Sequence, residues 1–140
     1  MNRMDEAHGL LSGLLNTFAA AESLEVKWEG MPADPSTDIY LREWLMPGQF
    51  TGHHLGPNAP NTGPLIYQVD VVSTLYGWGA AYGIAKLFFG DSYFARGQVL
   101  VNTDNTTRII VQSGQTGPAM REDTKYVLPM SVTFRAYMTI

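Results

Sequence analysis

Apolar and polar residues alternate from Leu65 to Val71, and the spacing of the apolar residues then changes from two to nearly four. Because successive side chains of a strand point to opposite faces, the alternation predicts a strand with one apolar face. The longer spacing predicts a helix that ends at Gly90. Its apolar positions are Trp78, Ala81, Tyr82, Ala85 and Phe88. Ser73 and Thr74 are placed to cap its first turn, so a strand leads directly into a helix.

This helix is rich in small residues, including Gly77, Gly79 and Gly83. An interior glycine costs about 0.5–1 kcal/mol relative to alanine, so helix propensity does not explain them. We expect close packing of the helix against a sheet or a neighbouring chain. A membrane span over residues 71–90 is the rival interpretation, and we disfavour it because the segment begins as a strand and its glycines, hydroxyls and tyrosines dilute its hydrophobicity.

An amphipathic helix is predicted from Asp5 to Ala21, because five large apolar residues form one stripe along it. They are Leu10, Leu11, Leu14, Leu15 and Phe18. His8 lies near the start of this helix, and no second titratable group follows it at the third or fourth position. We therefore expect His8 to face solvent or the helix cap rather than to bind a ligand.

Two strands are predicted before residue 47, at 24–28 and 39–46, with a proline-containing loop between them. In the strand at 39–46, apolar residues occupy both alternating sets of positions, which point to opposite faces. This strand is therefore expected to be buried on both faces, within the domain or against another subunit. Residues 47–64 then form a long segment rich in glycine and proline, which we expect to project as a contact loop. Its His53 and His54 are adjacent and point to opposite sides, so a metal site is not expected there.

Further strands are predicted at 98–102, 107–112 and 128–138, the first two joined as a hairpin. Pro129 cannot donate a backbone hydrogen bond and predicts an edge or a bulge at the start of the last strand. The order of elements predicts an α+β fold, with a mostly antiparallel sheet of about four to six strands and two helices packed on one face. At 140 residues, the chain is expected to form a single domain over 1–140.

Composition excludes several classes of function. The chain has no cysteine, which removes disulfides, thiolate nucleophiles and cysteine zinc sites. Its net charge of −4 argues against charge-driven DNA binding. Only 16% of the residues are charged, which fits a subunit partly covered by partners and equally a compact β protein rich in glycine and proline. The N-terminus lacks the pattern of a secretory signal, so we expect assembly in the cytoplasm.

No motif predicts catalysis or cofactor binding. The chain lacks a phosphate-binding glycine loop. Ser73, His53 and Asp70 could be written as a triad, but the glycine-flanked serine motif is absent. The carboxylates, Glu43 among them, are scattered and are expected to be solvated. We therefore expect no enzyme activity, no cofactor and no metal.

Four segments together resemble the tail terminator proteins of long-tailed bacteriophages, of the lambda minor tail protein U-like kind. After a leucine-rich helix, "LEVKWEGMP" runs into a proline loop and "IYLREWLMP" into a Gly/Pro loop. "GPLIYQVDVVST" then leads into the Ala/Gly helix, and "YVLPMSVTFRAYM" closes the chain. The resemblance covers nearly the whole chain and rests on the order of these elements.

The resemblance implies a structural virion protein that forms a hexameric ring at the head-proximal end of the tail. Such a ring binds the tail tube protein, stops tube polymerisation and presents the surface on which the head–tail connector docks. DNA would pass through it without sequence-specific binding. Two alternatives stay open: another head–tail connector or tail-completion subunit, and a small ligand-binding domain or enzyme.

Large aromatic residues and arginine are enriched at protein interfaces. On this ground we expect a set of subunit or tube contacts in the long loop and the strands beside it. The candidates are Arg42, Trp44, Phe50, His53, His54, Leu55 and Arg135. Arg42 and Arg135 are candidate partners for carboxylates on a neighbouring subunit, and Trp44 could equally be a core residue.

Overall fold

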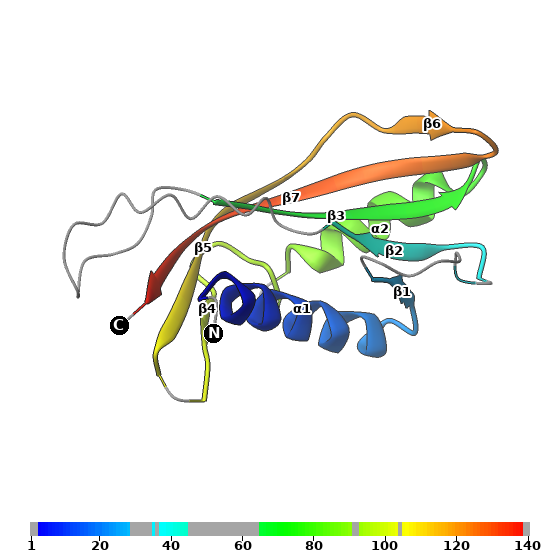
Figure 1. Cartoon of the computed structure of the whole chain (residues 1–140). Coiled ribbons are helices and arrows are strands. Elements are labelled where there is room, and N and C mark those ends of the chain that lie inside the picture. The colour runs from blue at the N-terminus through cyan, green and yellow to red at the C-terminus, as the bar shows by residue number, and fades with distance from the viewer. Residues whose placement is uncertain are drawn as a thin grey trace.

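The computed structural model describes residues 3–28, 35, 37–44, 65–90, 93–103 and 105–138, and these contain two helices and seven strands (Figure 1). In chain order they are α1 (Arg3–Ala21), β1 (Glu25–Lys27), β2 (Tyr40–Glu43), β3 (Leu65–Thr74), α2 (Trp78–Phe88), β4 (Val99–Val101), β5 (Thr107–Thr116), β6 (Met120–Glu122) and β7 (Lys125–Met138). The α+β class is as predicted, and the segments predicted as helices are helical.

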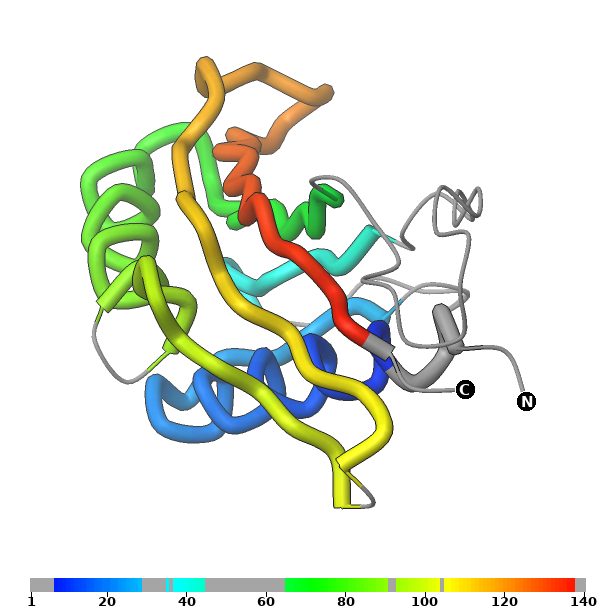
Figure 2. Tube along the Cα trace, turned by 90° about the vertical axis from the view of Figure 1, so that its left-hand side faces the viewer, coloured from blue at the N-terminus to red at the C-terminus, as the bar shows by residue number. Residues whose placement is uncertain are grey.

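The strands form one curled sheet in the order β1-β2-β3-β7-β5-β4, with β6 also paired to β7 (Figures 1 and 2). β1 runs parallel to β2, while the other pairs are antiparallel. The sheet is therefore mixed and has seven strands, which corrects the prediction of a mostly antiparallel sheet of four to six. The hydrophobic pattern of three-residue β1 does not encode direction. The three residues of β6 are all exposed, so no alternation marks it.

β3 and β7 pair over ten residues and form the centre of the sheet. One face of β3 enters the main core through Tyr67, Val69 and Val71. Both helices contribute to the same core: α1 through Leu11, Leu15 and Phe18, and α2 through Ala81, Ala85 and Phe88. The rings of Phe18 and Phe88 meet edge to face at 5.5 Å between centroids, a favoured aromatic geometry.

A second, smaller cluster lies on the opposite face of the sheet, where Tyr40, Val72 and Val127 are buried together. Lys125 lies over the Tyr40 ring at 5.1 Å and donates to its hydroxyl at 3.1 Å. Leu41, the neighbour of Tyr40, belongs to the main core. β2 is thus buried on both faces, as its two-phase apolar pattern predicted.

The start of α2 differs from the prediction. β3 continues through Ser73 and Thr74, so these hydroxyls lie in the strand and do not cap the helix. The N-cap is Gly77, with no side-chain cap hydrogen bond, and Ser73 donates instead to the carbonyl of Thr74. A ladder of ten residue pairs with β7 outweighs a single cap, because each pair adds backbone hydrogen bonds.

The glycines within α2 are not explained by packing inside the chain. A Cβ added to Gly79 or Gly83 would meet no atom within 4 Å. Close approach does explain Gly114 of β5, where an added Cβ would lie 2.3 Å from the Phe89 ring. Among the described residues, no helix is long and apolar enough to cross a lipid bilayer.

The strand predicted over residues 107–112 is longer than expected, because β5 continues to Thr116 beyond a register shift between Val111 and Ser113. The prediction for Pro129 holds locally: β7 has neighbours on both sides, but its residues 128 and 129 pair only with β3. The missing N–H of Pro129 falls between the pairing of Met130 with β5 and that of Val127 with β6. The proline is tolerated in a central strand because that side has no ladder at this position.

Candidate interaction surface

Four polar and aromatic side chains gather on the face of β2 and β3 opposite the main core. The register pairs Arg42 with Asp70, and the N–H of Trp44 donates to the carbonyl of Gln68 at 3.1 Å. Since side chains two residues apart share a face of a strand, Arg42, Trp44, Gln68 and Asp70 lie on the same side. We call these four residues the Asp70 cluster.

Asp70 is the acceptor at the centre of this cluster, and its side chain is only 3% exposed. Its Oδ2 accepts hydrogen bonds from Arg42 Nη2 at 2.9 Å, Arg42 Nε at 3.3 Å and Trp44 Nε1 at 2.6 Å. Its Oδ1 accepts from Gln68 Nε2 at 3.2 Å. A carboxylate removed from water is stable when a cation and neutral donors surround it in this way.

Arg42 has a second acidic partner, Glu122 of β6. Arg42 Nη1 lies 3.1 Å from Glu122 Oε1, and Nη2 lies 3.3 Å from Oε2, a bidentate arrangement. Burial lowers the pKa of Arg42, but hydrogen bonds to Glu122 and Asp70 and their charges outweigh it, so the pKa lies above its ordinary value. The guanidinium therefore stays charged and joins three strands of one chain, and both of these carboxylate partners are intramolecular.

Trp44 presents an ordered aromatic surface. Its indole N–H is bound to Asp70 and the Arg42 guanidinium lies 5.1 Å from its ring centroid, yet 42% of the residue is exposed. Ile66, two residues from Gln68 on β3, is 56% exposed on the same face. Because its partners already fix the ring, contact through Trp44 would lose little side-chain entropy, which favours binding.

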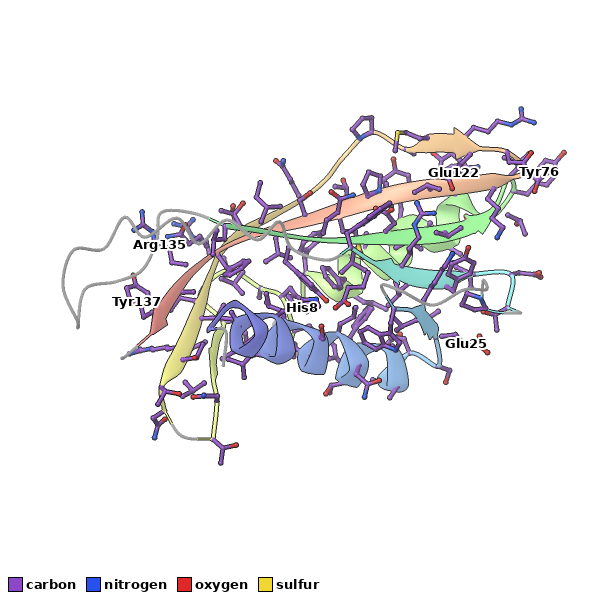
Figure 3. The ribbon with its side chains drawn as sticks, viewed as in Figure 1. His8, Glu25, Tyr76, Glu122, Arg135 and Tyr137 are labelled. Carbon is purple, nitrogen blue, oxygen red and sulfur yellow. The ribbon has the colours of Figure 1, made fainter. Side chains whose placement is uncertain are left out.

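The other candidate contacts are distributed differently. Arg135 lies on β7 opposite Ile110 of β5, at the end of the molecule away from Glu122 (Figure 3). The structure thus brings Arg42 and Trp44 together and leaves Arg135 apart. The remaining candidates lie outside the described residues: Phe50, His53, His54 and Leu55.

A buried carboxylate that the sequence reasoning missed lies on the core side of β2. Glu43 was expected to be solvated, but its side chain is 3% exposed. It accepts hydrogen bonds from Ser12 Oγ at 2.5 Å and from the Tyr67 hydroxyl, and His8 Nε2 lies 3.4 Å from its Oε1. His8 therefore faces Glu43, where it is 22% exposed, rather than only solvent. We call these residues the Glu43 cluster.

The electrostatics of the Glu43 cluster favour an anionic carboxylate. Burial raises the pKa of Glu43, but hydrogen bonds from His8, Ser12 and Tyr67 and the charge of His8 outweigh it, and the pKa lies below its ordinary value. Burial and the Glu43 carboxylate raise the pKa of the Tyr67 hydroxyl. Glu43 thus accepts from donors on α1 and β3 and ties helix to sheet. The sequence did hold a signal for this burial. Glu43 lies two residues after Leu41 and therefore on the same face of β2, and Leu41 is buried.

The Glu43 cluster lacks the geometry of a serine nucleophile. In a Ser–His–acid relay the two imidazole nitrogens contact different partners. Here the same atom, His8 Nε2, lies 3.4 Å from both Ser12 Oγ and Glu43 Oε1, and Ser12 donates directly to Glu43. Over the described ranges, no three His, Cys, Asp or Glu side chains converge as a metal site. The arrangement fits a structural role.

Comparison with known proteins yields a likeness of fold. No protein-family model matches the chain, and no curated protein matches it. Six chains of solved structures do match. One of them, whose description states no function, is 20% identical, covers 100% of this chain and 99% of its own, and superimposes with a TM-score of 0.76. At this level of identity the likeness shows a shared fold over the full length and no more.

Proposed function

We propose that this chain is a structural protein of a bacteriophage tail, which assembles into a ring, taken to be hexameric, that caps the head-proximal end of the tail tube. The ring ends tube polymerisation and offers the docking surface for the head–tail connector. The sequence resemblance supports this proposal through the order of its elements: a leucine-rich helix, strands, an Ala/Gly helix and strands. The structure has its described elements in that order.

The observation that carries the proposal is the placement of large side chains at the surface on ordered supports. Trp44 keeps 42% of its surface exposed while Asp70 and Arg42 hold its ring. Tyr76, Trp78 and Ile66 are more than half exposed. Exposed apolar groups in such number are typical of subunits that are covered in an assembly. A ring subunit needs both lateral and axial contacts of this kind.

We also propose that α1 and α2 cover the same face of the sheet. Support comes from the single core that both helices enter, together with the phases of β3, where Tyr67 and Val69 belong to that core and Val72 does not. This architecture leaves the face that carries the Asp70 cluster available to partners. The chain's net charge of −4 fits a ring that encloses DNA without adhering to phosphate.

The test combines mass in solution with a capping assay. Light scattering after size exclusion is run over a range of protein concentrations, and images are examined for rings with a central channel. The protein is then added to polymerising tail tube protein of the same phage. We expect tubes of limited length with a ring at one end. Rings that leave tube length unchanged would favour another head–tail connector, and a monomer that neither assembles nor alters tubes would overturn the proposal.

A further inference from the structure

Three exposed aromatic residues cluster where β3 turns into α2. Tyr76 is 96% exposed, Trp78 57% and Tyr82 43%, and the last two rings meet edge to face at 6.5 Å. We call these three residues the aromatic corner. An aromatic side chain has about 150–250 Å² of surface, so the corner leaves about 300–500 Å² uncovered. That is about half of what one partner contributes to a standard protein interface, about 800 Å².

A second exposed surface lies on β4, β5 and β7. The register places two rows of three residues side by side on the face opposite the core: Val101, Arg108 and Tyr137, and Val99, Ile110 and Arg135. We call these six residues the outer strip. Val99 and Val101 are 42% and 44% exposed. The outer strip is thus an apolar surface that carries two guanidinium groups.

The two surfaces lie at opposite ends of the molecule. Tyr76 lies two residues after the end of β3, whereas Arg135 follows Phe134, the partner of the first residue of β3, Leu65. Ten residues of strand separate them by about 30 Å. Figure 3 shows Tyr76 at one end and Arg135 and Tyr137 at the other. A two-fold contact through either surface would leave the other exposed, whereas a head-to-tail contact covers both and repeats from copy to copy.

The chemistry of the two surfaces is complementary. Arginine stacks on aromatic faces, and the chain already places Arg42 over Trp44 and Lys125 over Tyr40 at 5.1 Å. Neither arginine of the outer strip forms an ion pair with another described residue. The aromatic corner carries no charge of its own. Beside it, Gly79 has open space where a side chain would be, which lets a neighbouring backbone approach closely.

We propose that the aromatic corner of one copy packs against the outer strip of the next copy of this chain, with Arg108 and Arg135 over the aromatic rings. The contact is heterologous and therefore propagates around a ring. This inference rests on the proposed function, which requires a ring. It assigns the two surfaces through which neighbouring subunits of the ring make contact.

Because the chain has no cysteine, the contact can be tested by placed thiols. Ala80→Cys, at an exposed position of α2 beside the aromatic corner, marks that surface, and Val101→Cys marks the outer strip. Neither change removes an aromatic ring or an arginine. With a short bis-maleimide, the double variant is expected to give a ladder of covalent multimers that ends at the ring number, and each single variant to stay monomeric on a denaturing gel. Gly13→Cys with Val101→Cys is the matched control, because Gly13 lies in open space on α1.

The outcomes separate this inference from the proposed function. Rings that form without the ladder would overturn the assigned surfaces and leave the ring function standing. A ladder with no effect on tube polymerisation would support the surfaces and contradict the capping function. Efficient dimers from either single variant would show a two-fold contact and overturn the proposal. Salt-dependent binding of duplex DNA that is abolished by Arg108→Ala would also overturn the proposal, because the outer strip would then be a nucleic-acid surface.

Discussion

Asp70 holds the exposed indole of Trp44 in place through a 2.6 Å hydrogen bond, although the carboxylate is itself 3% exposed and the ring is 42% exposed. The same oxygen accepts two hydrogen bonds from Arg42. A buried charge thus orients two surface groups that the sequence marked as contacts. The order of this surface depends on one carboxylate that lies beneath it.

Replacing Asp70 with asparagine is expected to destabilise the fold by about 1–3 kcal/mol, because it leaves the Arg42 guanidinium without its buried counter-charge. The free energy of unfolding is measured in urea at neutral pH. Trp44 should also become more mobile, which is followed by acrylamide quenching in a variant whose Trp28 and Trp78 are phenylalanine.

The matched control is Glu122→Gln, which removes the other partner of Arg42. The Glu122 side chain is 59% exposed, so the expected loss is at most about 1 kcal/mol. If both variants lose the same amount, the buried carboxylate is not what stabilises the cluster.

Stability is expected to fall at acidic pH in a way that depends on Glu43. Its pKa in the folded state lies below the ordinary value of 4.5, so the unfolded chain binds more protons through that range. The contribution of Glu43 is complete above about pH 4.5 and is lost as the pH falls through the folded pKa. The free energy of unfolding is measured in urea from pH 7 to pH 3 for the wild type and for Glu43→Gln. The difference in this free energy between the two proteins should shrink as the pH falls below about 4.5. A constant difference would contradict a lowered pKa.

The pattern of the sequence predicted the segments in which alternation or helical spacing persists. β3 and β7 are ten and fourteen residues long, and their apolar phases are the buried ones. The three residues of β6 are all exposed, so no alternation of apolar and polar residues marks it as a strand. The direction of β1 is likewise a property of its partner β2.

Half of the candidate surface could be predicted from residue type, and half depends on contacts between distant positions. Arg42 and Trp44 were named as candidate contacts because of their chemistry, with a core position for Trp44 left open. Of the donors to Asp70, only Gln68 lies in its own segment, whereas Trp44 and Arg42 come from 26 and 28 residues away. Glu43 was misjudged for the same reason: Ser12 and Tyr67, which satisfy its charge, lie on other elements.

Gly114→Ala is expected to destabilise the fold by about 1–3 kcal/mol, because the new Cβ would lie 2.3 Å from the Phe89 ring. Phe89→Leu removes that ring, so the double variant should recover part of the loss. Unfolding in urea of the two single variants and the double variant measures the coupling. Additive losses would show that Phe89 does not set the requirement for glycine.

Gly83→Ala is expected to act in the opposite direction on the monomer. Nothing lies within 4 Å of the added Cβ, so the substitution should stabilise α2 by about 0.5–1 kcal/mol through helix propensity alone. If the exposed face of α2 lies in a subunit contact, the same methyl group should weaken assembly by holding the neighbouring chain away. Urea unfolding at low concentration and light scattering at high concentration measure the two effects. Greater stability with unchanged assembly would place Gly83 outside any contact, whereas greater stability with weaker assembly would explain why a helix keeps glycine at a position where alanine fits.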